Sequence, residues 1–318
     1  DFSLKPVYGK SDEITLLIPE GRDITVIKHA EEERKEFADR LQRAEKMEVL
    51  GRLSGGVAHD LNNVLGVMVG YSELLQEKLP DDSPLKRYAD NIHQSTVRGA
   101  AIIQDLLTLA RRGVTVSEVV DLNKLVLNYF RTLEFEKLRA DHPGVKIDSS
   151  LAGGLLNIKG SPVHLGKTLM NLISNAVESI AGLGEVMVRT ENRYLDRPLL
   201  GYDQMQEGDY VVLTVTDTGG GIPAKDIGKI FEPFYTKKAM GRSGTGLGLA
   251  IVWGVVKDHN GYIDVQSREG EGTVFSLYFP VTREEPMKEG IAVSLETYKG
   301  RGEAILVVDD VEAQRELA

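Results

Sequence analysis

Apolar residues between positions 50 and 110 recur with the period of an α-helix. Steps of three and four residues connect a first apolar series, which consists of Leu50, Leu53, Val57, Leu61, Val64, Met68, Tyr71 and Leu75. A second helical series runs through Leu85, Tyr88, Ile92, Gly99, Ile103, Leu106 and Ala110. Pro80 and Pro84 separate the two series, so the pattern predicts two antiparallel helices joined by a turn. Two amphipathic helices cannot enclose a core alone, and we therefore expect a homodimer that forms a four-helix bundle.

Strand-like patterns occur on both sides of this helical pair. The segment VVLTVTD alternates apolar and polar residues, which predicts a strand that ends at Asp217. Near the amino terminus, DFSLKPVYG and DEITLLIPEG predict strands, and a charged helical stretch follows them. At the other end, EAILVVDD predicts a strand that finishes in Asp309 and Asp310. Neither terminal piece can bury itself alone, so we expect the chain to begin and end inside further domains.

Composition narrows the classes of protein that fit. The chain has 318 residues, enough for two or more domains, and 42% of them are hydrophobic. Its net charge of -10 argues against nucleic acid or an anionic membrane surface as the main partner. Because cysteine is absent, neither disulfides nor a thiolate metal site can form. No apolar run approaches the roughly 20 residues of a membrane span, so we expect a cytoplasmic location and leave open a membrane anchor upstream.

Three motifs follow one another between Asn171 and Gly248, namely NLISNAVES, DTGGGIP and GTGLGLAIV. In the first, Asn171 and Asn175 share one helix face and can hold a metal ion and phosphate oxygens. In the second, Asp217 ends a strand, where its carboxylate can accept a hydrogen bond from an exocyclic amine. The glycines after it allow the backbone to approach a base closely. This order of motifs predicts a nucleotide site.

The third motif places glycines directly before an apolar helix. Gly244, Gly246 and Gly248 leave backbone N–H groups free to face phosphates, with the helix dipole behind them. Two other nucleotide motifs fail the spacing test. A dinucleotide fingerprint would require a glycine at Leu249, and a phosphate-binding loop would require one at Ser161.

His59 lies in GGVAHDLNN, away from the apolar series of its own helix. It stands two residues from both Val57 and Leu61, which turns it about 200° from that series and toward solvent. This placement disfavours the plain alternative of a buried core histidine. A neutral imidazole is a competent nucleophile, and Asp60 can bind the other ring nitrogen and take its proton. Asn63 follows one turn later on the same face and can position a water molecule or a phosphoryl oxygen.

These motifs resemble those of a known family. The segment GGVAHDLNNVLGVMVGYSELL resembles the phosphoacceptor helix of two-component sensor histidine kinases. The three nucleotide motifs resemble the N, G1 and G2 boxes of that family, and FEPFYTKK resembles its F box. The resemblance implies an α+β multidomain chain, in which an antiparallel helical hairpin forms a dimeric four-helix bundle. An α/β sandwich ATP-binding domain of the type found in gyrase, chaperones and histidine kinases would follow.

The resemblance also implies a role for each candidate residue. His59 would accept the γ-phosphoryl group of ATP, Asp60 would act as general base, and Asn63 would serve in dephosphorylation of the partner. Asn175 would bind Mg²⁺, with Asn171 as a second candidate ligand. The residues that would bind ATP are Asn171, Asn175, Asp217, Gly219, Gly221, Lys237, Lys238, Gly244, Thr245, Gly246, Leu247, Gly248 and Thr273.

Within that set, the resemblance implies more specific contacts at the base and at a lid. Asp217 would bind the adenine amine, Gly219 and Gly221 would close the loop beneath the base, and Thr273 would contact adenine through water. Residues 224–243 would form a lid from which Lys237, Lys238 or Arg242 reaches the phosphates. The alternative for the lysines is a solvated charged face. The predicted lid anchors, Phe231 and Phe234, have simple core packing as their alternative.

The same resemblance implies six segments and a hybrid kinase. They are a PAS sensor remnant at 1–28, a signalling coiled coil at 29–48, a dimerisation and phosphoacceptor domain at 49–113, an ATP-binding domain at 114–282, a linker at 283–302 and a truncated receiver at 303–318. The PAS exit would contain Asp23 and Thr25, and the receiver acids Asp309 and Asp310 would bind Mg²⁺. The partner would be a response-regulator receiver, the chain's own carboxyl-terminal one.

Two other functions stay open at this point. ATP-hydrolysing switches of the same fold resemble this chain, but they carry a glutamate four residues before the metal-binding asparagine. Here Asn171 occupies that place, and an amide cannot act as a general base. A non-catalytic dimeric scaffold would be expected to lack His59, an asparagine or a G2 glycine, and the sequence retains them all.

Overall fold

The computed structural model describes residues 2–8, 13–21, 23–28, 30–31, 34, 61–110, 118–237 and 244–285. The chain forms two units, residues 1–49 and 50–318. His59, Asp60, Lys238 and Arg242 lie outside the described residues, as do most of the predicted coiled coil and the whole predicted receiver segment. In the described part, no helix is long and apolar enough to cross a membrane.

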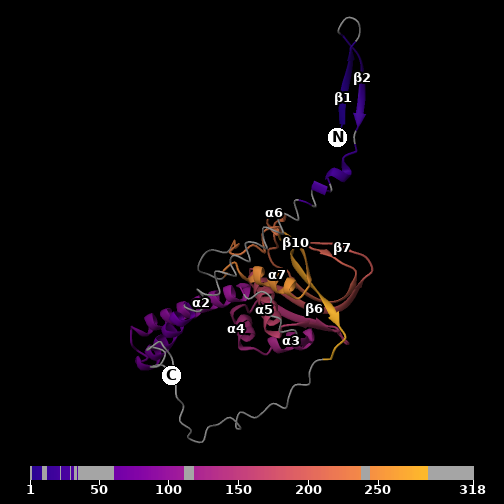
Figure 1. The fold of residues 1–318 in the computed structure, drawn as a ribbon. Coiled ribbons are helices and arrows are strands. Elements are labelled where there is room, and N and C mark those ends of the chain that lie inside the picture. Colours follow the sequence, from indigo (N-terminus) through magenta and orange to yellow (C-terminus); the bar gives the residue numbers. More distant parts are fainter. Residues whose placement is uncertain are drawn as a thin grey trace. The chain divides into compact units, whose positions relative to one another are not determined.

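The first unit contains an antiparallel pair of strands. The strand β1 (Phe2–Tyr8) pairs with β2 (Ile14–Gly21), so both predicted strands form (Figure 1). Every residue of the two strands is exposed, and an isolated two-stranded hairpin is marginally stable in water at best. After β2, Asp23 Oδ1 accepts a hydrogen bond of 2.9 Å from the N–H of Thr25, where a short helical stretch begins.

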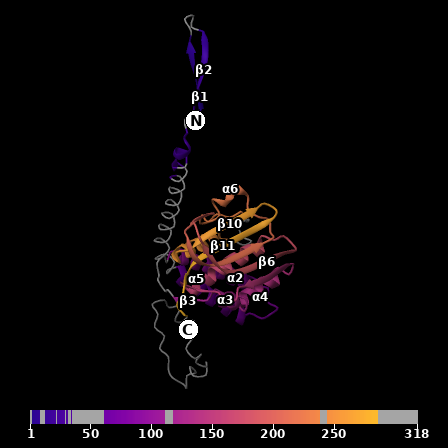
Figure 2. The ribbon, with the colours of Figure 1, turned by 90° about the vertical axis from the view of Figure 1, so that its right-hand side faces the viewer.

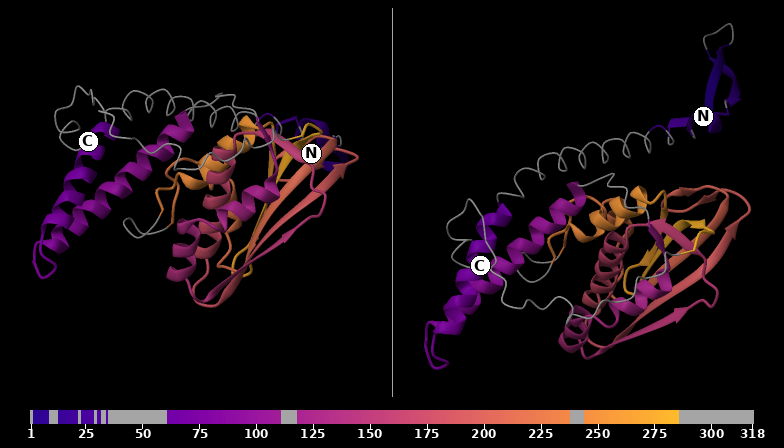
Figure 3. Two further views of the ribbon diagram at one scale, coloured as in Figure 1. Left: turned by 90° about the horizontal axis from the view of Figure 1, so that it is seen from below. Right: turned by 60° about the horizontal axis from the view of Figure 1, so that its bottom comes forward.

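The second unit opens with the predicted helical hairpin. Residues 61–78 form one helix, and α2 (Lys86–Ala110) runs back along it (Figure 3). The break predicted from Pro80 and Pro84 is therefore confirmed. Polar contacts join the two helices, because Ser72 Oγ lies 3.0 Å from His93 Nδ1 and Gln76 Nε2 donates to Asp90 Oδ1 at 2.7 Å. The inner face of the hairpin thus contains polar side chains, and Leu65 of the first helix lies beside Gly99 of α2.

Most described members of the predicted apolar series are exposed. Within one chain, the exposed members are Leu61, Val64, Met68, Tyr71, Leu75, Leu85, Tyr88 and Ile92. By contrast, Ser72, Ala89 and Thr96 are almost completely buried between the helices. The helical period was predicted correctly, but one chain by itself does not bury most of the predicted seam.

A mixed sheet of seven strands forms the main domain. Its strands are β3 (Glu118–Val120), β4 (Val145–Leu151), β5 (Asn157–Gly160), β6 (Gly184–Leu195), β9 (Gly208–Asp217), β10 (Tyr262–Arg268) and β11 (Gly272–Thr282). They lie in the order β3-β5-β11-β9-β6-β4, with β10 also paired to β11. The pair β4–β6 is parallel and the others are antiparallel. The strand predicted to end at Asp217 is β9.

Helices cover one face of this sheet (Figure 2). They are α3 (Leu122–Tyr129), α4 (Leu133–Asp141), α5 (Pro162–Glu178), α6 (Ala224–Ile227) and α7 (Gly248–Asp258). The helix α5 packs on β6 and β9, and α7 packs on β10 and β11. Fully buried side chains such as Leu169, Val188 and Leu277 form the core between the layers. The predicted fold class, a helical hairpin followed by an α/β sandwich, is confirmed.

A second, smaller apolar cluster lies on the opposite face of the sheet. Residues of a strand alternate between faces, so Tyr210, Val212 and Tyr278 point away from the helices. They pack with Leu195, the last residue of β6, and with Met205, which belongs to the connection between β6 and β9. This connection contains the short strands β7 (Leu199–Leu200) and β8 (Gln204–Met205). It therefore covers apolar surface that the helices leave open.

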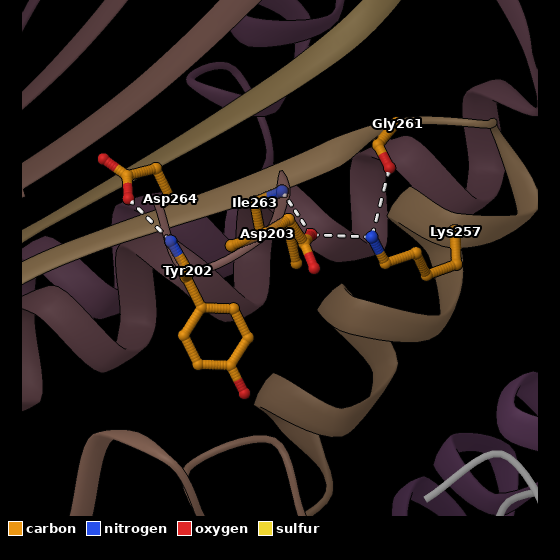
Figure 4. A network of polar contacts seen from close by, with 6 residues as sticks. All are labelled: Tyr202, Asp203, Lys257, Gly261, Ile263 and Asp264. Atoms are coloured by element: carbon orange, nitrogen blue, oxygen red, sulfur yellow. Dashed lines mark hydrogen bonds and ion pairs between the residues drawn. The ribbon is translucent and has the colours of Figure 1, made fainter. Parts of the chain in front are cut away.

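Asp203 fastens this connection to the helical layer (Figure 4). Its Oδ2 lies 2.6 Å from Lys257 Nζ of α7 and accepts a hydrogen bond of 2.9 Å from the N–H of Ile263 in β10. Next to it, the N–H of Tyr202 donates to Asp264 Oδ1 at 3.1 Å. Because the Asp203 side chain is 10% exposed, the ion pair is shielded from water on the carboxylate side.

Candidate nucleotide site

A cavity of about 460 Å³ opens where the three sequence motifs meet. Its wall includes the middle of α5, the end of β9, the segment before α7 and the start of β11. Residues from all three motifs line it, namely Asn171, Asn175, Asp217, Gly221, Gly244, Thr245, Gly246 and Gly248, and Thr273 of β11 lines it as well. The predicted Gly219 and Leu247 are not among the lining residues, and Leu247 is completely buried in the core.

Asp217 is a buried acid in the wall of this cavity. It is 5% exposed at the end of β9, and its Oδ1 accepts hydrogen bonds from the Gly219 N–H at 2.8 Å and from Ser179 Oγ at 3.0 Å. Burial raises the pKa of Asp217, while hydrogen bonds from Gly219, Ser179 and the Thr273 backbone act in the opposite direction. A carboxylate offers about four acceptor positions, so it can still receive a donor from a bound base.

The glycines after Asp217 serve the packing of the protein itself. A side chain at Gly219 would collide with Ser179 Oγ, which fills the space beside it. Gly221 has a φ of 67°, and a side chain there would collide with the carbonyl of Arg268. Gly219 therefore lies against Ser179, the residue after α5, and its place beneath the base stays a prediction.

The two asparagines of α5 differ in their surroundings. Asn171 Nδ2 donates a hydrogen bond of 3.2 Å to the carbonyl of Gly248, so this side chain ties α5 to the start of α7. Asn175 lies one turn further along and lines the cavity. In the described part of the chain, no group of three or more histidine or acidic side chains could hold a metal ion. An amide oxygen supplemented by phosphate oxygens and water is a donor set that suits Mg²⁺, so Asn175 fits this ion.

The start of α7 presents backbone donors to the cavity. Gly248 opens the helix and lines the cavity, and no side chain caps the helix there. The first N–H groups of a helix have no partner inside it, which makes them available to phosphate oxygens. Gly246 has a φ of 69°, and its carbonyl accepts a hydrogen bond of 2.9 Å from the N–H of Phe234. Thr245 Oγ1 accepts from the N–H of Leu247, so the loop is held by its own residues.

Lys237 lines the cavity but is paired with a residue that the sequence did not single out. Its Nζ forms an ion pair with Asp226 Oδ2, and Tyr235 Oη donates to Asp226 Oδ1 at 2.8 Å. Hydrogen bonds from Lys237 and Tyr235 hold the pKa of Asp226 below its usual value. Nothing in the motif pattern distinguishes Asp226 from an ordinary acid on the short helix α6.

Thr273 lies opposite Asp217 in the pairing of β11 with β9. It is 4% exposed, and its Oγ1 lies 2.9 Å from Ser267 Oγ, which also accepts a hydrogen bond from the N–H of Ile222 at 2.8 Å. Ser267 was not predicted. Its hydroxyl joins the end of β10 to the loop after Asp217. This contact between Ser267 and Ile222 could not be read from the sequence, because it depends on how the strands pair.

The aromatic residues of FEPFYTKK take two different positions. Phe231 is buried and packs edge-on against Tyr202 at 5.0 Å between ring centroids and against Phe275 at 6.5 Å. Core packing therefore accounts for Phe231. Phe234 is 56% exposed and has a φ of 65°, a conformation that is uncommon for a residue other than glycine.

In the hairpin, Asn63 is half-buried on the first helix.

Two family matches cover these regions. Residues 160–283 match the family described as "Histidine kinase-, DNA gyrase B-, and HSP90-like ATPase", and residues 49–114 match "His Kinase A (phospho-acceptor) domain". The chain belongs to the two-component histidine kinases. ATP is accordingly the nucleotide that fits the cavity of this histidine kinase.

Curated relatives agree with this assignment, and a solved structure shares the fold. Sensor kinase CckA of Brucella abortus (strain 2308) is 33% identical over 293 residues, which are 89% of this chain and 30% of that protein. Sensor histidine kinase ZraS of Escherichia coli (strain K12) is 31% identical over 80% of this chain and 50% of that protein. The crystal structure of full-length ShkA in complex with AMPPNP shares the fold, with a TM-score of 0.59, 24% identity, and coverage of 74% of this chain and 47% of that one. The chain spans half or less of the length of these two curated relatives.

Proposed function

We propose that this histidine kinase transfers the γ-phosphoryl group of ATP to its own His59, for relay to a receiver-domain aspartate. The observation that supports it best is the convergence of the three motifs on one cavity, with a buried acceptor at Asp217 and free helix N–H groups at Gly248. The phospho-acceptor match, residues 49–114, contains His59, Asp60 and Asn63.

The proposed chemistry divides into binding and transfer. Asp217 accepts a hydrogen bond from the exocyclic amine of adenine. The N–H groups at the start of α7 and the ammonium of Lys237 neutralise phosphate charge. Asn175 would hold Mg²⁺, which would supply further charge neutralisation. A neutral ring nitrogen of His59 attacks the γ-phosphorus, a new N–P bond forms, and the bond to the bridging oxygen of ADP breaks. Asp60 takes the proton from the other ring nitrogen, as a general base.

Transfer is favoured over hydrolysis by the contact of Asn171. The side-chain amide donates to the Gly248 carbonyl, and its charge state cannot change near neutral pH, so it cannot activate water. This observation argues against the alternative of an ATP-hydrolysing switch. A complete cavity wall from all three motifs argues against the other alternative, a non-catalytic scaffold.

The proposal includes a homodimer and a receiver partner. The exposed apolar face of the hairpin supports a four-helix bundle with a second copy, because eight large apolar residues of the predicted series, all in the described part of the hairpin, are each more than 40% exposed. The acids Asp309 and Asp310 support a receiver that follows the ATP-binding domain, and Asn63 supports phosphatase activity toward it. The Asp23–Thr25 turn after β2 supports a PAS remnant at the amino terminus.

Labelling with γ-labelled ATP and Mg²⁺ tests the transfer step. The full chain should acquire an acid-labile, alkali-stable label, as expected of a phosphohistidine, and His59→Gln should abolish it. His93→Gln is the matched control, because His93 lies on the inner face of the same hairpin beside Ser72. A label that persists in His59→Gln would place the acceptor elsewhere.

The phosphatase role is tested separately with Asn63→Ala and a phosphorylated receiver domain. We expect autophosphorylation within about threefold of wild type and receiver dephosphorylation slowed at least about tenfold, since Asn63 would position the attacking water. Loss of autophosphorylation in Asn63→Ala would contradict this division of roles.

A further inference from the structure

Ser179 connects the first nucleotide motif to the second. It follows the last residue of α5, and its N–H donates to the carbonyl of Asn175 at 3.0 Å. Its own carbonyl accepts a hydrogen bond of 3.1 Å from the N–H of Gly220. The backbone of this one residue therefore ties the asparagine helix to the loop after Asp217.

The Ser179 hydroxyl faces two acceptors but has a single proton. Its Oγ lies 3.0 Å from Asp217 Oδ1 and 2.8 Å from the carbonyl oxygen of Ala176. The proton can face only one of these oxygens, and the carboxylate of an ionised Asp217 attracts it more strongly than the neutral carbonyl of Ala176 does. A hydrogen bond to a charged acceptor is also the stronger of the two. The hydroxyl thus favours the ionised form of Asp217.

The surroundings hold this hydroxyl in place. A side chain at Gly219 would collide with Ser179 Oγ, so glycine is needed for Ser179 to approach Asp217. The Gly219 N–H then donates to the same Oδ1 at 2.8 Å. Two donors on one oxygen fix the rotation of the carboxylate about its bond to the rest of the side chain.

We propose that Ser179 is the positioning residue for adenine recognition, which holds the Asp217 carboxylate in the orientation that accepts the exocyclic amine. This inference rests on the proposed role of Asp217 and deepens it. Ser179 acts through Asp217 and need not touch the base. This role differs from that of Asn175, which in the proposed function holds Mg²⁺ near the phosphates.

The shift in the pKa of Asp217 does not arise from the described charged side chains of the cavity. They are Asp105, Lys167, Glu178, Asp226 and Lys237. The pKa of Asp217 is governed instead by burial, which raises it, and by the hydrogen bonds from Gly219, Ser179 and Thr273, which lower it. Removal of the Ser179 hydroxyl is therefore expected to move the pKa of Asp217 upward.

The test compares two ligands on the full chain by isothermal titration. One is ATP, and the other is purine riboside triphosphate, which lacks only the exocyclic amine. Ser179→Ala should weaken ATP binding about tenfold and change analogue binding less than about twofold, because only ATP uses the oriented carboxylate. Ser276→Ala is the control, since Ser276 faces Thr214 at 3.4 Å and lies outside the cavity lining. It should leave both affinities unchanged.

The ratio of the ATP affinity to the analogue affinity does not depend on the fraction of folded protein, because a change in that fraction affects the apparent binding of both ligands equally. Equal weakening of ATP and the analogue in Ser179→Ala would overturn the proposal, as would unchanged ATP binding. Two further results are expected: the pH midpoint below which ATP binding weakens shifts upward in Ser179→Ala, and Ser179→Ala has no further effect on the ratio in an Asp217→Asn background. Unchanged ATP affinity in Asp217→Asn alone would instead refute the proposed adenine role of Asp217.

Discussion

The helical hairpin and the ATP-binding domain differ in how far a single chain buries their apolar side chains. In the ATP-binding domain, helices cover one face of the sheet and the β6–β9 connection covers part of the other, so Leu169, Val188 and Val212 are almost completely buried. In the hairpin, Ser72 and Thr96 are buried and Met68 and Tyr88 are exposed. One chain by itself therefore buries the apolar core of the ATP-binding domain, but it leaves large apolar side chains of the hairpin exposed.

This difference shows what an amphipathic pattern can predict. A helical period identifies which residues share a face, but it contains no information about the element that covers that face. In the ATP-binding domain the cover comes from the same chain, so stability should not depend on protein concentration. In the hairpin the proposed cover is a second copy, so its effect should depend on concentration.

The largest expected effect concerns the exposed face of the hairpin. The pair of substitutions Met68→Glu and Leu75→Glu should raise the dissociation constant of the dimer at least about 100-fold, since both would place charge in an apolar interface. Analytical ultracentrifugation over a concentration series measures it. Glu73→Gln, an exposed change on the same helix, is the control and should leave the dimer intact. A dimer unaffected by the double substitution would remove this face from the interface.

A core truncation in the ATP-binding domain should cost about 3 kcal/mol of unfolding free energy. The position is Leu169, which is completely buried in α5, and Leu169→Ala leaves a cavity there. Urea unfolding at two protein concentrations should show the same loss for this domain. Val163→Ala, on the same helix but 78% exposed, should change the free energy by less than about 0.5 kcal/mol. A loss that grows with dilution would contradict a self-sufficient domain.

The ion pair of Asp203 should rank next. Asp203→Ala leaves the Lys257 ammonium and the Ile263 N–H without this partner, which should cost about 2 kcal/mol of unfolding free energy. Arg268→Ala breaks an ion pair of two exposed side chains and should cost less than about 0.5 kcal/mol. Thermal unfolding of both variants gives the comparison, and similar losses would mean that the Asp203 pair behaves as a surface contact.

The smallest expected effect is a dependence of stability on pH at His259. Its Nε2 accepts a hydrogen bond of 3.0 Å from the Ser161 N–H, while Nδ1 lies 2.6 Å from the Val255 carbonyl oxygen. Burial lowers the pKa of His259 below its usual value near 6.5, so the folded state binds fewer protons than the unfolded state in slightly acidic solution.

Stability should therefore fall as pH drops below about 6.5, by no more than about 1.4 kcal/mol per pH unit, until the folded pKa is reached. His259→Gln should flatten this part of the profile, which urea unfolding between pH 5 and 7 measures. His142→Gln serves as the comparison on a half-buried histidine at the end of α4. An unchanged slope in His259→Gln would assign the dependence to other groups.

Much of the candidate site could be predicted because its motifs are short and local. The order of NLISNAVES, DTGGGIP and GTGLGLAIV identified a nucleotide cavity, and the structure brings members of all three to one wall. The contacts made by Ser179, Asp226 and Ser267 could not be predicted. Ser179 reaches Asp217 across 38 positions of sequence, and Ser267 reaches Ile222 across 45, so both depend on how strands and helices pair. Lys237 was expected at the phosphates, but its pairing with Asp226 was not.

The sequence by itself determined the helices and their turn, the strand that ends at Asp217, and the family to which the chain belongs, because periodicity and motif spacing are local properties. Only the tertiary structure decided why Gly219 must be glycine, what holds Asp217 in place, and which apolar residues stay uncovered. These properties arise from atoms that are distant along the chain and meet only after folding. The packing of α5 against the loop after β9 is the clearest case, since it joins Ser179 of the first motif to Asp217 of the second.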